Sequence, residues 1–398
     1  MASNRSVDER RIEALGKTYE TRTIEDWIVT LYSVYKDHNI TSGPYDLWLQ
    51  AVNDASQLAE TIRREIIRTK FPSETNVHTQ LARLFCRISA FVGRYLYDHQ
   101  SVGAEDPMGG GLAGEPLDDY IGGEEKYEKW ILLKYPYSCP TCGTCPCVCA
   151  SYRNIMENRG SKAYSEFWSE NKKRFIRQKD RYSHVDGDLS QATKKMYEKS
   201  IDDWVRVFYD IYTSSHIEVP LESIAFHFLE EVGEVSDGLL CIDELHKYRS
   251  KAGVYCRDTV DIDKSIMTRA EQEPKYAKFL DEYKTRKIGD EEREPSDSAS
   301  QYLLQINMNV VKEELADVFS WMCAILNKIS ATYKHWNPDG KLRSMSDVLH
   351  ERYGRISGEV GCSYCSKAIC APDCLMESAI RKSIKKRTEK LEHRLFWR

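Results

Sequence analysis

The sequence lacks the usual marks of an exported or membrane-embedded protein. Its first residues, "MASNRSVDERRIEALG", contain no apolar signal-peptide core, and no apolar run in the chain approaches the length of a membrane span. The net charge is −5 over 398 residues, so no basic excess indicates general nucleic-acid binding. We therefore expect a cytoplasmic protein that binds neither membranes nor nucleic acids in general.

Strand-like alternation of apolar and polar residues is also scarce, whereas apolar-rich segments with helical spacing recur. The glycine-rich stretch at 101–123 carries no G-K-[ST], which argues against a phosphate-cradling loop. The apolar content of 41% and charged content of 30% are ordinary for a globular protein, and the length suits two or three domains. We expect an all-α fold.

Cysteine, by contrast, is abundant, with 13 residues in the chain. Disulfides are not expected in a reducing compartment, so these thiols must have a different role. Two segments, "SCPTCGTCPCVC" and "GCSYCSKAICAPDC", both contain C-x2-C-x4-C, and C-x2-C supplies two zinc ligands from one turn. The pattern predicts two closed, structural zinc sites per chain. A reduced cysteine-rich loop and an iron–sulfur site are the alternatives.

Each cysteine cluster offers four candidate ligands for a tetrahedral zinc ion. In the first cluster (139–149) they are Cys139, Cys142, Cys147 and, as the fourth, Cys149 or Cys145. In the second cluster (362–374) they are Cys362, Cys365, Cys370 and Cys374.

Acidic residues recur inside two apolar-rich segments, "FHFLEEVGEVSDGLL" (226–240) and "VVKEELADVFSWMCAIL" (310–326). Residues three apart share a helix face, and like charges held together repel unless a cation lies between them. The paired acids are Glu231 with Glu234 and Glu314 with Asp317. Four carboxylates on two facing helices predict a site for a hard divalent cation, Mg²⁺ or Mn²⁺.

Two alternatives to this cation site remain. Exposed helices with solvated ion pairs would show the same charges, although the apolar context argues against them. A di-iron site would normally contain Glu-x-x-His pairs, and the nearby histidine, His227, fits packing better than metal ligation.

The chain also contains an internal repeat. "TIEDWIVTLYSVY" (23–35) aligns with "SIDDWVRVFYDIY" (200–212) at an offset of 177, and "QLARLFCRI" (80–88) aligns with "ELADVFSWM" (314–322). The repeat predicts a tandem duplication whose first copy has lost most of its acids. The aligned positions are Asp54 with Glu231, Gln57 with Glu234, Gln80 with Glu314, and Arg83 with Asp317.

We expect two domains, each ending in a cysteine cluster. Residues 1–180 form the first copy and residues 181–398 the second, with a junction in the polar stretch at 178–198. The second copy carries a long insertion at 241–304, which we expect to contain a short helix (273–287) and an acidic, polar loop (289–300).

"EEVGE" followed by "EELAD" resembles the MazG-like, all-α nucleotide pyrophosphohydrolases, whose motif is E-x-x-E then E-x-x-D across a helical hairpin. The resemblance covers 200–240 and 305–355 and reaches the first copy only through the repeat. It implies Mg²⁺ ligands at Glu231, Glu234, Glu314 and Asp317. The long insertion and the cysteine clusters depart from the family pattern.

The resemblance implies hydrolysis of a nucleoside triphosphate, (d)NTP + H₂O to (d)NMP + PPi. Glu230 or Glu313 would accept a proton or support the ligands; each also fits a solvated partner of a neighbour such as Lys312. Trp321 would stack on the base, although such an aromatic also fits a core, and Arg352 would contact a phosphate. Because the family builds its bundle from two subunits, the duplication implies an intramolecular pseudo-dimer with an inactive first copy.

Two rival functions stay open. One is a nucleotide sensor or zinc-scaffolded interaction protein without turnover, and the other is a phosphohydrolase that releases orthophosphate. The sequence also leaves open which base and sugar the protein prefers and whether the chain forms a homo-oligomer. It does not decide between a housekeeping role and a role in phage defence.

Overall fold

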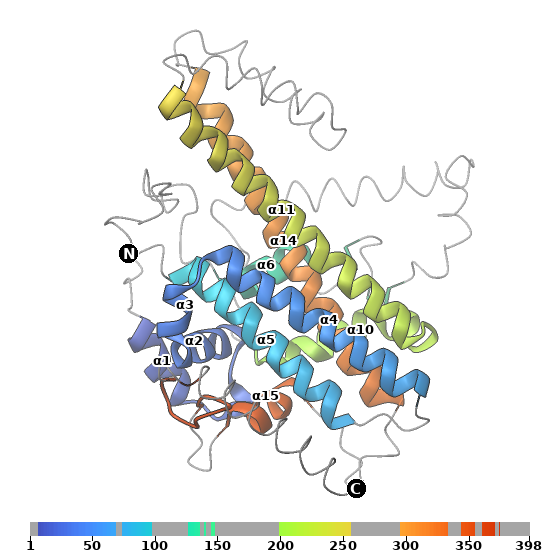
Figure 1. Ribbon diagram of the computed structural model, residues 1–398. Helices are drawn as coiled ribbons and strands as arrows, with labels where there is room; N and C mark the ends of the chain where they lie inside the picture. The colour runs from blue at the N-terminus through green and yellow to red at the C-terminus, as the bar shows by residue number, and fades with distance from the viewer. Residues whose placement is uncertain are drawn as a thin grey trace, which may run out of the picture. The chain divides into compact units, whose positions relative to one another are not determined.

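The computed structural model describes residues 7–68, 74–97, 126–135, 139–140, 145–147, 199–255, 295–332, 344–354, 360–370 and 374. Every regular element in these ranges is a helix, and the described part contains no strand, only isolated bridges (Figure 1). The all-α expectation is confirmed. No helix in the described ranges has the length and apolar character needed to cross a membrane.

The helices follow one another in a simple order. They are α1 (Val7–Leu15), η1 (Tyr19–Thr21), α2 (Ile24–Val34), α3 (Lys36–Thr41), α4 (Pro44–Arg68), α5 (Glu74–Tyr97), α6 (Tyr127–Lys134), α10 (Ile201–Glu218), α11 (Leu221–Tyr255), α14 (Pro295–Thr332) and α15 (Met345–Tyr353). The chain divides into two compact units. Unit 1 comprises Met1–Ser101, Pro116–Leu229 and Val318–Arg398, and unit 2 comprises Val102–Glu115 and Glu230–Asp317.

In unit 1, α2 is the central helix, buried along most of its length between α1 and α5. A capping box begins it: the Thr23 side chain accepts from the Asp26 N–H, and the Asp26 carboxylate accepts from the Thr23 N–H. Its Trp27 and Tyr32 side chains are completely buried. Large aromatic side chains such as these supply much of the apolar burial that holds a helical core together.

Repeat-aligned residues meet one another in unit 1. Thr23 pairs with Ser200, 177 positions later, in an isolated antiparallel bridge, and the Ile201 N–H donates to the Arg22 carbonyl at 3.0 Å. The rings of Phe85 and Phe319, which the repeat also aligns, lie 6.3 Å apart between centroids. The two segments that align in sequence therefore pack through their own equivalent positions.

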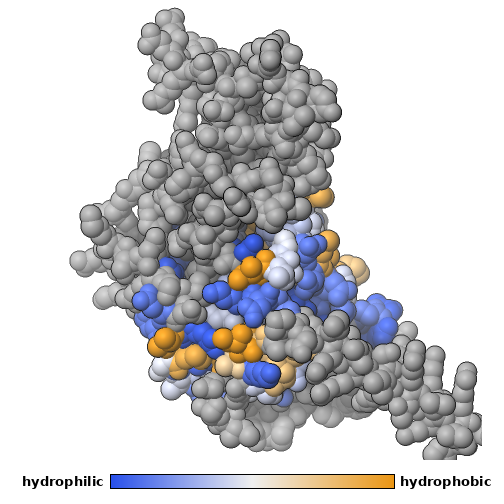
Figure 2. Space-filling view, turned by 60° about the vertical axis from the view of Figure 1, so that its left-hand side comes forward, coloured by the Kyte–Doolittle hydropathy of each residue, from blue (hydrophilic) through white to orange (hydrophobic). Residues whose placement is uncertain are grey.

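The described surface mixes polar and apolar side chains. On the face drawn in Figure 2, hydrophilic residues are interspersed with small groups of hydrophobic ones. Exposed large apolar side chains occur in the described ranges, among them Ile12 on α1 and Leu49 on α4. Scattered apolar residues of this kind are normal on a protein surface, so they do not by themselves indicate a docking site.

Unit 2 contains the C-terminal part of α11 from Glu230 and the N-terminal part of α14 as far as Asp317, running antiparallel to each other (Figure 1). The insertion expected at 241–304 proves to be partly an extension of these helices, since α11 continues to Tyr255 and α14 begins at Pro295.

The prediction of a loop at 289–300 was therefore wrong over Pro295–Ser300, which is helical. Proline suits the first position of a helix because its missing N–H needs no partner there, and Asp297 favours the first turn. The expected helix at 273–287, the glycine-rich stretch and the junction at 178–198 lie outside the described residues.

Candidate metal sites

Three of the four predicted acids converge in unit 2. Glu231 and Glu234 on α11 and Glu314 on α14 each offer a carboxylate oxygen, and these oxygens all lie within 4.8 Å of one another. Ligand oxygens around one Mg²⁺ ion, with bonds of about 2.1 Å, are separated by about 3–4 Å. After a small adjustment, these three side chains could thus hold one hard divalent cation.

The convergence follows from how the two helices present an apolar and an acidic face. Val232 and Val235 on α11 are buried, as are Leu315 and Ala316 on α14. Glu231 and Glu314 are half-buried, and Glu234 is exposed. Three carboxylates held this close repel one another unless a cation or protons compensate their charge. The three carboxylates could hold a cation.

The other candidate acids lie outside this triad. Asp317 is buried with 9% exposure and, among the described residues, does not belong to the group of three. Glu230 and Glu313 are exposed. The structure brings together Glu231, Glu234 and Glu314, while the fourth ligand and the proton acceptor stay predictions.

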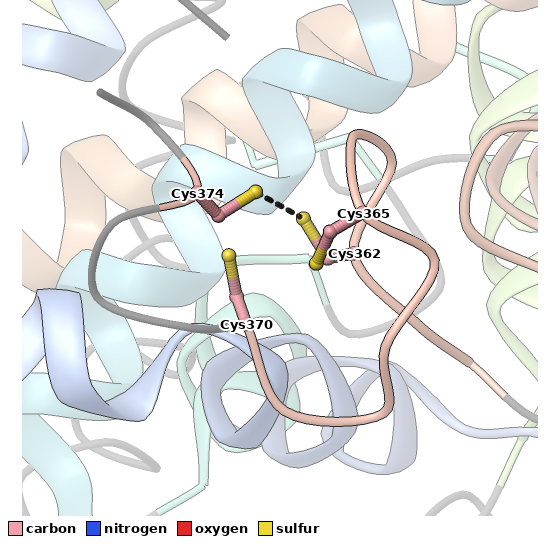
Figure 3. A group of neighbouring side chains, drawn as sticks. All are labelled: Cys362, Cys365, Cys370 and Cys374. Atoms are coloured by element: carbon pink, nitrogen blue, oxygen red, sulfur yellow. Dashed lines mark hydrogen bonds between the residues drawn. The ribbon is translucent and has the colours of Figure 1, made fainter. Parts of the chain in front are cut away.

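The second cysteine cluster forms a four-thiol site. Its four sulfur atoms lie within 4.8 Å of one another, and Figure 3 shows the side chains turned toward a common centre. The Sγ atoms of Cys362 and Cys374 are 3.8 Å apart. A tetrahedron with Zn–S bonds of about 2.3 Å has edges of about 3.8 Å, so this one separation equals the edge expected around zinc.

The loop geometry of this site depends on a tight turn. Ser366 has a φ of 58°, in the left-handed region, and its N–H donates to the Cys362 carbonyl at 2.8 Å. Burial raises the pKa of Cys370, and it raises the pKa of Cys374 to about 11. A bound metal ion would favour the thiolate form of these side chains and so act against this shift.

This second cluster is fixed to α1 and α2. The Cys370 N–H donates to the Val34 carbonyl at 2.7 Å, and Arg11 Nη2 donates to the Ala368 carbonyl at 3.1 Å. The Ser363 N–H donates to the Tyr35 hydroxyl at 3.2 Å. Ordering of the loop of the second cysteine cluster therefore also stabilises the C-terminal end of α2.

The first cysteine cluster is only partly described. Cys139 and Cys147 are buried, and the Cys147 N–H donates to the Ile211 carbonyl on α10 at 2.6 Å. Cys145 is exposed. The expected ligands Cys142 and Cys149 lie outside the described residues.

The positions that the repeat aligns with the acids also converge, but around an arginine. Arg83 Nη2 on α5 donates to Asp54 Oδ1 on α4 at 2.8 Å. Arg83 Nη1 lies 3.3 Å from the side-chain oxygens of both Gln57 and Gln80. The guanidinium thus supplies, inside this four-residue cluster, the positive charge that a cation would supply among the acids.

The two candidate substrate contacts have identifiable neighbours in unit 1. The Trp321 ring is stacked on His227, with centroids 5.2 Å apart and planes inclined by 19°. Arg352 lines a pocket together with Asp54, Arg83 and Arg87. Sequence reasoning overlooked Arg87, although it follows Arg83 by one helical turn and the repeat aligns it with Trp321.

Comparisons of the chain with protein-family models, curated proteins and solved structures give no match.

Proposed function

We propose that the chain is a Mg²⁺-dependent nucleoside triphosphate pyrophosphohydrolase that converts a (d)NTP and water to a (d)NMP and pyrophosphate. The observation that carries the proposal is the convergence of Glu231, Glu234 and Glu314 on the antiparallel pair α11 and α14. It is supported by the E-x-x-E and E-x-x-D spacing of the MazG-like enzymes, in which Asp317 completes the set.

The acids would hold the cation and keep it accessible. When bound, a divalent cation neutralises phosphate charge and lowers the pKa of a coordinated water. The exposure of Glu234 leaves the site open to a triphosphate, whereas the buried valines behind the triad hold the carboxylates in place. Glu230 and Glu313, both exposed, are the candidate proton acceptors for the attacking water.

We further propose that the two repeat-aligned segments are copies of one helical unit arranged as an intramolecular pseudo-dimer. Two-fold packing brings residues near the axis into contact with their own equivalents, as Thr23 does with Ser200 and Phe85 with Phe319. The first copy would be structural, because Arg83 occupies its cluster and repels cations.

Each cysteine cluster would hold one structural Zn²⁺ ion. The 3.8 Å separation of the Cys362 and Cys374 sulfurs supports this for the second cluster. For the first cluster, the exposure of Cys145 beside the buried Cys139 and Cys147 favours Cys149 as the fourth ligand.

The test is incubation of the zinc-loaded chain with a mixed pool of ribo- and deoxyribonucleoside triphosphates and Mg²⁺, followed by chromatography of the products. The proposal expects monophosphate and pyrophosphate in equal amounts. Diphosphate with orthophosphate would instead show the rival hydrolase, and tight nucleotide retention without turnover would show a sensor. Glu234→Gln is the matched inactive control.

A further inference from the structure

A pocket in unit 1 lies where α3, α4, α5 and α15 meet the loop of the second cysteine cluster. Its volume is about 130 Å³. It contains the four-residue cluster's Asp54 and Arg83, and two further arginines, Arg87 from α5 and Arg352 from α15, complete its described charged lining. Polar side chains, among them those of Asn39, Ser42 and Tyr364, also line it.

The charged side chains that line this pocket carry a positive excess. Among the described residues, three arginines face one carboxylate, that of Asp54, which is 2% exposed. Arg83 is paired closely with Asp54 at 2.8 Å, but the Arg87 Nε contact to the same carboxylate is longer, at 3.4 Å. Arg83 pairs with Oδ1 of Asp54 and Arg87 with Oδ2, so one carboxylate stands against three guanidinium groups, and the described lining keeps a net positive charge.

Arg352 also has an unsatisfied donor. Its Nε is buried and has no hydrogen-bond partner within the part of the chain that the structure describes. A buried donor without a partner costs free energy that a bound acceptor would recover. Arginine presents its N–H groups as a planar fork that matches carboxylate and phosphate oxygens better than any neutral ligand.

We propose that this pocket is a binding site for a small, multiply charged oxyanion of the phosphate class, with Arg87 and Arg352 as its principal contacts. The volume is close to that of a cavity of about 150 Å³ that admits benzene, and it is well below the roughly 300–1,000 Å³ of sites for drug-sized ligands. Inorganic phosphate or pyrophosphate fits this size.

The site is independent of the proposed hydrolase activity. It is built from residues of unit 1, whereas the carboxylate triad belongs to unit 2. The four-residue cluster, part of which lines this pocket, has Arg83 at the position aligned with Asp317 and Gln57 at the position aligned with Glu234. At the aligned positions the first copy thus carries the positive charge of Arg83, and the two arginines proposed to bind the anion lie in the same pocket.

The experiment is calorimetric titration of the zinc-loaded full chain with inorganic pyrophosphate, and separately with inorganic phosphate, at low ionic strength and without added Mg²⁺. We expect saturable one-to-one binding of at least one of them, weakened about tenfold or more by Arg87→Gln and by Arg352→Gln. Arg352→Lys, which keeps the charge but not the fork, should lose less. Arg63→Gln, at an exposed arginine of α4 that pairs with Glu60, is the matched control and should bind as the wild type does.

Circular dichroism of each variant establishes whether it is folded. If a glutamine variant does not fold, Arg352→Lys still tests the role of Arg352. The relative affinity of phosphate and pyrophosphate then identifies which anion the pocket prefers. Unchanged binding in both Arg87→Gln and Arg352→Gln would overturn the proposal, as would the absence of binding of either anion.

Discussion

The backbone N–H of Cys370 donates a 2.7 Å hydrogen bond to the carbonyl oxygen of Val34, at the end of α2. Cys147, which occupies the matching place in the first cysteine cluster, donates in the same way to Ile211 at 2.6 Å. Val34 and Ile211 are themselves aligned by the repeat, 177 positions apart. Each cluster is thus fixed to a helix of the other repeat segment, so a metal ion that orders a cluster also ties the two segments together.

Zinc removal should therefore destabilise the helical core as well as the loops. Elemental analysis of protein purified without added metal should find about two zinc ions per chain. Cys370→Ser should lose about one of them and lower the melting temperature, since structural zinc contributes directly to folding. Cys323→Ser, at a buried cysteine outside both clusters, is the control and should keep both ions. Less than about half an equivalent of zinc in the wild type would contradict the assignment.

Loss of one acid of the triad should abolish the activity without unfolding the chain. Glu231→Gln is expected to reduce Mg²⁺-dependent turnover at least about 100-fold, because it removes a charge that holds the cation. The metal-free variant should be slightly more stable, by about 0.3–0.5 kcal/mol, since a like-charge repulsion is relieved. Asp237→Asn removes an exposed acid of the same helix and should leave turnover unchanged. Turnover close to that of the wild type in Glu231→Gln would eliminate the triad as the site.

Asp317 provides a separate test of the four-acid set. The proposal expects Asp317→Asn to reduce turnover about as much as Glu231→Gln does, because a bound cation would recruit its carboxylate. The measurement is the rate of pyrophosphate release at saturating Mg²⁺. A reduction below about tenfold would restrict the cation site to Glu231, Glu234 and Glu314.

The first copy should bind no catalytic cation. Titration of the zinc-loaded chain with Mn²⁺, followed by electron paramagnetic resonance, is expected to show a single class of tight sites that Glu234→Gln removes. Arg83 is the reason, because its guanidinium lies 2.8 Å from the one carboxylate in the aligned four-residue cluster. Residual Mn²⁺ binding in Glu234→Gln that disappears on adding Asp54→Asn would show that the first copy is a working site.

Two helical glycines should respond oppositely to alanine. A Cβ added at Gly93 in α5 would lie 2.5 Å from the Tyr32 ring, which is itself buried in the core, so Gly93→Ala should cost about 1–3 kcal/mol. A Cβ at Gly233 in α11 meets no described atom within 4 Å, so Gly233→Ala should add up to about 1 kcal/mol through helix propensity. Denaturant unfolding of the pair measures both, and a stabilising Gly93→Ala would contradict the close packing of α5 on α2.

What the sequence by itself determined about this protein is local. The helices, the three-residue spacing of Glu231 and Glu234, and the paired cysteines of C-x2-C all depend on residues within a turn or two of each other, so their periodicity was enough to predict them. The internal repeat extended this reach, because it aligned Asp54 and Arg83 with acids expected on two facing helices, and the structure pairs these two residues.

Only the tertiary structure decided which of these local features meet. Three acids converge while Asp317 stays outside the triad, because side-chain reach depends on how α11 and α14 pack rather than on spacing along either helix. The continuation of α14 back to Pro295 was missed because a polar, acidic segment has no apolar periodicity that marks it as helical. Arg352 shares a pocket with Arg87 although 265 positions separate them in the chain, and no local pattern encodes a pairing over that distance.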